Sequence, residues 1–262
     1  MFNILRPLIF KFSPEVAHSL AIKALKLNNI PYSKPKDNHI LETTFCEKKL
    51  SSPIGVAAGF DKNAEVYNPL FNLGFGFVEV GTITPKPQFG NPKPRVFRLE
   101  EDEALINRLG FNNSGSEQIS QTIKENNKKG FLGINIGPNK DSTNRIDDYL
   151  ICFRKFYNLA DYITINISSP NTENLRDFHN QDELNSLIDK LKNEKKKLNS
   201  NIPLAIKVSP DLNDDQINEV SKIIMEQEIG IIIVSNTTDL SLIHISEPTR
   251  RRGISYAVFC LK

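Results

Sequence analysis

The sequence predicts an α/β protein: an incomplete (β/α)8 barrel of the TIM type, preceded by an N-terminal helical hairpin. Short apolar segments alternate with amphipathic helical stretches from residue 53 onward, and polar or small residues follow almost every apolar segment. The first 30 residues have a separate helical pattern. Strands that alternate with helices form right-handed βαβ units and a parallel sheet. The length of 262 residues is that of many single barrels.

Residues 1–30 are predicted to form an amphipathic helical hairpin. Apolar residues recur at helical spacing over 2–12, and Ser13, Pro14 and Glu15 supply an N-cap, a first-turn proline and an acidic first turn for a second helix. One face of this second helix is apolar and comprises Val16, Leu20, Ala24 and Leu27. Such a hairpin either docks on the rest of the protein or lies in a membrane interface, and the pattern leaves both open.

Residues 31–240 are predicted to form the partial barrel, beginning with a polar, proline-bearing linker over 31–40. Six strands are expected, near residues 54, 77, 132, 162, 204 and 231. The segment 182–198 reads as a helix whose many charges face solvent. Between the second and third strands, residues 83–115 form a longer excursion, which we expect to be an extra hairpin or a lid.

Composition excludes several classes of protein. The net charge is only +2, so the chain has no overall field for nucleic acid. Its three cysteines have no CxxC spacing, which indicates a reducing compartment and neither a disulfide framework nor a zinc site. No segment is apolar enough to span a bilayer, and the start lacks the pattern of a secretory leader. We therefore expect a soluble or membrane-surface protein.

Polar and small residues stand at equivalent places after the predicted strands, where barrels carry their functional groups. These are Lys62 after "AAGF", Gly81 and Thr82, Asn135, the stretch "NISSPN" (166–171), Lys207, and Ser235 to Thr238. Each alone is consistent with an ordinary turn or a solvated lysine. Together they hold two lysines with neutral amides and hydroxyls, and no histidine, thiol or carboxylate cluster that would bind metal. Such a pocket suits a planar anionic ligand and a redox cofactor.

The segment "INRLGFNNSG" (106–115) adds three amides, from Asn107, Asn112 and Asn113, to the long excursion. Loops that carry amides over the mouth of a barrel commonly close on substrate. We therefore expect this loop to contribute to the site.

Long motifs resemble the class 2, quinone-dependent dihydroorotate dehydrogenase family. They are "AAGFDKNAE", "GFGFVEVGTITPKPQFGNPKPRVFRL", "INRLGFNNSG", "LGINIGPNKDS", "DDYLICFRKFYNLADYITINISSPNTENLR", "AIKVSPDL" and "VSNTT". The resemblance extends from about residue 2 to residue 239. It implies oxidation of dihydroorotate to orotate in pyrimidine biosynthesis, with FMN as hydride acceptor and a quinone as final electron acceptor.

The resemblance also implies residue roles. Ser169 matches the base that removes a proton from C5 of dihydroorotate, and a serine there is typical of class 2. The substrate contacts are Lys62, Asn107, Arg108, Leu109, Gly110, Phe111, Asn166, Asn171, Asn236 and Thr237. The FMN contacts are Ala58, Thr82, Asn135, Asn166, Lys207 and Ser235. His18 and Arg98 match residues that line a quinone tunnel beside the hairpin. This implies peripheral attachment to the cytoplasmic side of the cell membrane, as in a bacterial inner membrane, with no nucleic-acid partner.

Residues 241–262 depart from the family pattern. They lack a βα period and the glycine-bearing motifs that hold the FMN phosphate, and they contain three consecutive arginines, Arg250 to Arg252. This tail resembles a translated sequencing adapter, so we expect the authentic chain to stop near Asp239 or Leu240. The competing interpretations are a basic tail for nucleic acid or lipid and a divergent terminus. Two functional alternatives remain: a non-catalytic fragment, or another FMN-dependent barrel oxidoreductase.

Overall fold

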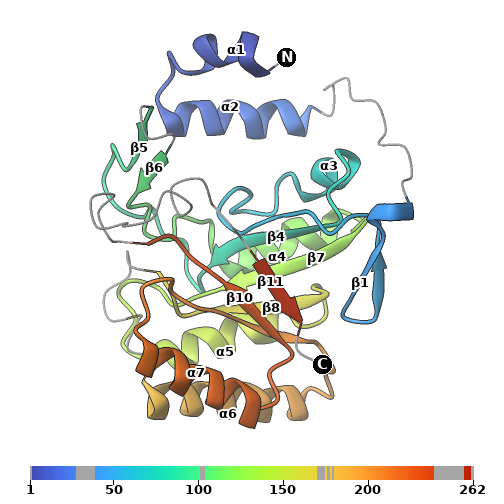
Figure 1. The fold of residues 1–262 in the computed structure, drawn as a ribbon, viewed down its shortest axis with the longest axis vertical. Helices are drawn as coiled ribbons and strands as arrows, with labels where there is room; N and C mark the ends of the chain where they lie inside the picture. The colour runs from blue at the N-terminus through green and yellow to red at the C-terminus, as the bar shows by residue number, and fades with distance from the viewer. Residues whose placement is uncertain are drawn as a thin grey trace.

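The computed structural model describes residues 2–27, 39–100, 104–169, 175, 178, 180–238 and 257–260 (Figure 1). Most of the predicted linker lies outside the described residues, as do Asn171 and most of the tail. Pro170 lies outside them as well.

All six predicted strands are present, side by side in one sheet. They are β3 (Gly55–Val56), β4 (Phe77–Ile83), β7 (Phe131–Ile136), β8 (Tyr162–Asn166), β9 (Leu204–Lys207) and β10 (Ile231–Val234). Their order is the order of the chain, and every neighbouring pair is parallel. This is the arrangement of consecutive βα units in a barrel, so the predicted incomplete barrel is confirmed.

The tail contributes a seventh strand, which the sequence did not lead us to expect. β11 (Ala257–Cys260) pairs with β10 in the antiparallel sense, with Ile231 opposite Cys260. The edge of the sixth strand, β10, is therefore paired. An unpaired edge offers a row of free backbone donors and acceptors, and any extended segment that reaches it can satisfy them.

Five helices connect the strands: α3 (Tyr67–Asn72), α4 (Gly115–Glu125), α5 (Arg145–Phe156), α6 (Gln181–Lys197) and α7 (Asp214–Glu226). Figure 1 shows α5, α6 and α7 together on one side of the sheet. α6, the predicted charged helix, buries Leu184, Leu187 and Leu191 at helical spacing and leaves its lysine-rich side to solvent. α7 begins with a capping box in which Asn213 and Gln216 bond each other's backbone amides.

The N-terminal hairpin consists of α1 (Phe2–Ile9) and α2 (Pro14–Lys26), as predicted. α2 packs beside β5 (Val96–Leu99), which pairs with β6 (Ala104–Asn107) as the expected extra hairpin (Figure 1). The apolar face predicted for the second helix, Val16, Leu20, Ala24 and Leu27, is exposed. Ile22 and Leu25 are buried instead, so α2 docks through a different side.

A small hairpin that the sequence analysis missed closes the amino-terminal end of the sheet interior. It comprises β1 (Thr43–Phe45) and β2 (Lys48–Leu50), and a single turn, η1 (His39–Leu41), precedes it. The Phe45 ring packs against the rings of Phe77, Phe131 and Tyr162 at centroid distances of 6.1, 5.4 and 5.7 Å. Aromatic residues from the hairpin and from three strands therefore share one apolar cluster.

Replacing Phe45 with alanine should lower the free energy of unfolding by about 2–4 kcal/mol, because it removes the partly buried ring that packs against the other three rings. Urea denaturation would measure the change. Phe89→Ala is the matched control, since that ring is 96% exposed and its loss should leave stability nearly unchanged. Equal effects of the two substitutions would show that Phe45 does not plug the sheet.

Candidate active site at the carboxyl ends of the strands

Polar side chains from three neighbouring strands converge where β4, β7 and β8 end. Thr82 donates from Oγ1 to Asn135 Oδ1 at 2.6 Å. Asn166 donates from Nδ2 to Thr82 Oγ1 at 2.9 Å and to Asn135 Oδ1 at 3.2 Å. Lys207 is in register beside Asn166 on β9, and all four residues are buried. We call Thr82, Asn135, Asn166 and Lys207 the strand-end cluster.

A buried carboxylate lies one layer below this cluster. Glu79 of β4 accepts from Asn135 Nδ2 at 2.9 Å, from the Tyr162 hydroxyl at 2.9 Å and from Thr164 Oγ1 at 2.8 Å. Burial lowers the pKa of Lys207, and the negative charge of Glu79 opposes that shift. The cluster therefore combines one lysine with neutral amides and a hydroxyl, above the Glu79 carboxyl group.

Gly81 joins the loop after β3 to the strand-end cluster. Gly59 N donates to Gly81 O at 2.8 Å, and Gly81 N donates to Asp61 O at 3.0 Å. The φ angle of Gly81 is +115°, and a Cβ there would lie 2.4 Å from Asn135 O, so only glycine fits. The bonded loop carries two predicted site residues, Ala58 and Lys62, both half-buried.

Lys62 has an ammonium that gives up its proton unusually easily. Burial, and then the nearby Arg95 guanidinium, lower its pKa to about 8, while Glu15 and Asp61 act in the opposite direction. The ammonium donates to the Gly59 carbonyl in its own loop. A half-buried cation in a loop beside the strand ends can bind a carboxylate.

The segment after β8 is tied to the segment after β10. Ser168 Oγ donates to Asn166 Oδ1 at 3.0 Å and accepts from Asn236 Nδ2 at 3.0 Å. Ser169 follows with only 4% of its surface exposed. The structure thus brings Asn166, Ser169 and Asn236 to one end of the sheet. The same segment after β10 carries two further predicted residues, Ser235 and Thr237.

The loop after β6 approaches the same end mainly through its backbone. Asn107 ends β6, Leu109 O accepts from Asn91 N at 3.0 Å, and Gly110 O accepts from Gln88 Nε2 at 2.9 Å. Two predicted residues of this loop, Phe111 and Arg108, have different surroundings. The Phe111 ring lies close to Gly137, just past β7, where a Cβ would be 3.1 Å from the ring. Arg108 donates to Pro94 O at 2.9 Å on the outer side of the loop.

The amides of this loop differ in their contacts. Asn113 bonds Thr84, Phe111 and Gly115 and therefore braces the loop. Asn112 Oδ1 is the one buried side-chain polar atom without a partner in the part of the chain that the structure describes. Buried acceptors are nearly always hydrogen-bonded, so this oxygen is suited to an N–H donor from a ligand.

These donors fit the ring system of a flavin. Isoalloxazine is planar, with carbonyl and N–H edges, and the strand-end cluster offers amides, a hydroxyl and one ammonium to such edges. Gly137 provides close backbone approach, since a Cβ there would lie 2.8 Å from Thr82 Cγ2. Thr82, Asn135, Asn166 and Lys207 are the residues that would hold the ring.

The two residues predicted to line a quinone site contact different parts of the molecule: His18 faces the barrel from α2, and Arg98 of β5 contacts the turn between α1 and α2. His18 Nε2 is 2.7 Å from the Phe60 carbonyl, and burial followed by the Lys62 charge lowers its pKa. Arg98 donates from Nη1 to Phe12 O at 2.8 Å, and its guanidinium lies 4.5 Å from the centroid of the Phe10 ring. α2 is thus bonded to the loop that carries Lys62.

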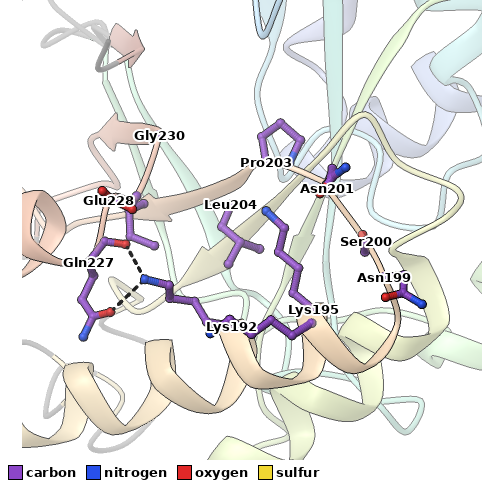
Figure 2. Close-up of a pocket in the computed structure, with 12 residues that line it drawn as sticks. Lys192, Lys195, Asn199, Ser200, Asn201, Pro203, Leu204, Gln227, Glu228 and Gly230 are labelled. Carbon is purple, nitrogen blue, oxygen red and sulfur yellow. Dashed lines mark hydrogen bonds between the residues drawn. The ribbon is translucent and has the colours of Figure 1, made fainter.

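A cavity of about 700 Å³ lies away from these residues (Figure 2). Pro203, Leu204 and Gly230 place it at the amino-terminal ends of β9 and β10, opposite the strand-end cluster. Lys192 donates to Gln227 O at 3.1 Å there. The lysines near it stand in the last turns of α6, where cations complement the helix dipole, and we take them to be structural.

Sequence reasoning missed Glu79, Tyr162 and Tyr149. The Tyr149 hydroxyl donates to Asn166 O at 2.6 Å. A signal for Glu79 was present, because it is the single acid within the apolar strand "FVEVGTI". The two tyrosines had no such signal, since a tyrosine in an apolar segment usually only packs.

Comparisons with known proteins agree with this geometry. The family model described as dihydroorotate dehydrogenase matches residues 40–254. A Bartonella tribocorum protein named dihydroorotate dehydrogenase (quinone) is 47% identical over 237 residues, 89% of this chain and 66% of the relative. A Nitrosomonas europaea protein with the same name is 43% identical, covering 98% of this chain and 78% of the relative. The chain thus spans about two thirds of the length of the Bartonella relative.

Solved structures give the same result. The ligand-free DHODH of Eimeria tenella superimposes with a TM-score of 0.84 at 36% identity, over 90% of this chain and 72% of that one. The same organism's DHODH in complex with ferulenol gives 0.82 at 36% identity, over 92% and 69%.

Proposed function

Because the chain belongs to the dihydroorotate dehydrogenase family, we propose that it oxidises dihydroorotate to orotate and passes the electrons through FMN to a quinone. This is a step of pyrimidine biosynthesis. The observation that carries the proposal is the buried strand-end cluster with Ser169 beside it. The quinone-dependent names of the relatives support the choice of acceptor over another flavin barrel with a different substrate.

Ser169 is the proposed base that takes the proton from C5 of dihydroorotate. A neutral serine is a weak base in water, and it becomes effective only when it is held in place and shielded from solvent. Ser169 is 4% exposed, and the Ser168 bonds to Asn166 and Asn236 fix the segment that carries it. Lys62 would bind the carboxylate of the substrate, and Asn107, Asn171 and Asn236 would bind its ring.

FMN supplies the hydride acceptor when it is bound. The residues of this chain would orient it: Asn135 and Asn166 would offer amides to the ring, and Ala58 and Ser235 would contribute further contacts. Lys207 would place a positive charge where negative charge develops on reduction, which lowers the barrier to hydride transfer.

The N-terminal hairpin is the proposed membrane and quinone side of the protein. Its exposed apolar residues include Leu8, Val16, Leu20 and Leu27, the last with 68% of its surface exposed. Arg6, Lys23 and Lys26 on the same two helices, and Lys11 in the turn between them, supply positive charge. Apolar side chains flanked by basic ones favour the surface of an anionic membrane. In the described residues, no helix is both long and apolar enough to cross a bilayer. We infer peripheral attachment on the cytoplasmic side.

The test is dihydroorotate-dependent reduction of a soluble quinone analogue by the purified, FMN-supplemented protein. We expect quinone to be the best acceptor. If NAD or fumarate accepted the electrons far faster than the quinone analogue, the proposed acceptor would be wrong. If another planar substrate reduced the flavin far faster than dihydroorotate did, the proposed substrate would be wrong.

The activity should decline as pH rises above about 8, because substrate binding requires the Lys62 ammonium, whose pKa is about 8. The protonated fraction of such a group falls about tenfold between pH 7 and pH 9, and kcat/KM for dihydroorotate should fall with it. Lys62→Arg is the control: a guanidinium stays charged over this range, so its profile should be flat there. A decline of the same size in Lys62→Arg would assign the titration to another group.

A further inference from the structure

Glu79 is a buried acid in the interior of the sheet. Glu79 is 3% exposed. It stands in register with Gly133 on β7, and Gly133 is in register with Tyr162 on β8. Both carboxylate oxygens are engaged: Oε1 accepts from Asn135, and Oε2 accepts from Tyr162 and Thr164. Such a position is unfavourable for an anion unless hydrogen bonds and an opposite charge compensate for the lost water.

The three hydrogen-bond donors are neutral and supply no positive charge. Burial, followed by the Glu79 charge, raises the pKa of Tyr162 well above its ordinary value, so the phenol keeps its proton. Lys207 is the buried cation of the same interior. It is 3% exposed and stands in register with Asn166 on the neighbouring strand, and Asn166 bonds the Asn135 amide that Glu79 holds. Burial lowers the pKa of Lys207, and the Glu79 charge opposes that shift.

We propose that Glu79 is a positioning residue whose carboxylate is the counter-charge of Lys207 and keeps the Lys207 ammonium charged inside the sheet. The same carboxylate orients Asn135 by a hydrogen bond, so one acid fixes two members of the strand-end cluster. The inference deepens the proposed function, because a charged Lys207 is what that function requires beside the flavin. The pairing itself is a property of the protein without flavin.

A purely structural role for Glu79, as the acceptor for three neutral donors, makes a different prediction. In that case the loss of Glu79 would lower the free energy of unfolding by the same amount whether or not residue 207 is charged. If Glu79 is a counter-charge, its loss leaves Lys207 as an uncompensated buried cation, whereas removing both charges relieves each of them. A double-mutant cycle separates the two roles.

The experiment measures urea unfolding of four proteins without flavin or substrate: the wild type, Glu79→Gln, Lys207→Met and the double variant. Glutamine preserves the shape and can still accept from Asn135 while donating to the two hydroxyls. We expect Glu79→Gln to raise the unfolding equilibrium constant at least about tenfold more in the wild-type protein than in the Lys207→Met variant. Additive effects would overturn the proposal.

Asp61→Asn combined with Lys207→Met is the matched control. Asp61 is also a buried carboxylate, but it caps the backbone amides of Glu65 and Val66, so this cycle should be additive. If a single variant does not fold, the double variant decides the question. A double variant that folds would support the proposal that Glu79 is the counter-charge of Lys207, and one that does not fold would overturn the proposal. Because no flavin is present, an additive cycle would leave the proposed reaction untouched, and a failed acceptor assay would leave the pairing untouched.

Discussion

Replacing Ser169 with alanine should lower the rate of flavin reduction by dihydroorotate about 10²–10⁴-fold, the usual effect of losing a positioned general base. Ser169 is buried and directly follows the segment that Ser168 ties to Asn166 and Asn236. Alanine removes the hydroxyl and keeps the backbone, so the flavin should remain bound. Stopped-flow absorbance of the flavin would measure the rate, and flavin titration would measure binding.

Ser168→Ala is the matched control, because Ser168 is an adjacent buried serine whose hydroxyl is already committed to two amides. Its loss should lower the free energy of unfolding by about 0.5–1.5 kcal/mol for each neutral hydrogen bond removed, and it should not remove the base. A nearly normal rate in Ser169→Ala would exclude Ser169 from proton transfer. If Ser168→Ala lowered the rate of flavin reduction as much as Ser169→Ala, the assignment of the base to Ser169 would be wrong.

The strand-end cluster could be predicted from the sequence because barrel geometry converts chain order into spatial position. Each apolar segment is a strand in the same direction, so the residues after each one meet at the same edge. Thr82, Asn135 and Asn166 follow this rule and bond one another directly. The roles of these residues remain proposals, because the rule gives position and not chemistry.

The parts that could not be predicted have short or ambiguous patterns. β1 and β2 have three residues each, too few for a visible alternation, so the hairpin that carries Phe45 had no signal. α2 carries apolar residues outside its predicted apolar face, and the pattern could not tell the docked side, with Ile22 and Leu25, from the exposed side, with Val16 and Leu20. Glu79 stands in a strand buried on both faces, where alternation does not say which side chains point inward.

The two halves of the reaction should separate when α1 alone is removed. Deleting residues 1–12 takes away α1 and the Phe10 and Phe12 contacts of Arg98, but keeps α2. Reoxidation of the flavin by quinone should fall at least about 10²-fold, as expected when a reactant is no longer positioned, while flavin reduction by dihydroorotate stays within roughly threefold. The two half-reactions are measured separately by rapid mixing.

Deleting residues 1–30 should damage both half-reactions, because α2 also holds the loop that carries Lys62. His18 contacts the Phe60 carbonyl at 2.7 Å, and Lys26 pairs with Glu65 in the same loop. If deleting residues 1–12 lowered dihydroorotate oxidation as much as quinone reduction, α1 would be a structural element rather than part of a quinone site. If deleting residues 1–30 left dihydroorotate oxidation intact, α2 would not position Lys62. The two deletions therefore test two assignments separately: the quinone contacts of α1, and the positioning of the substrate loop by α2.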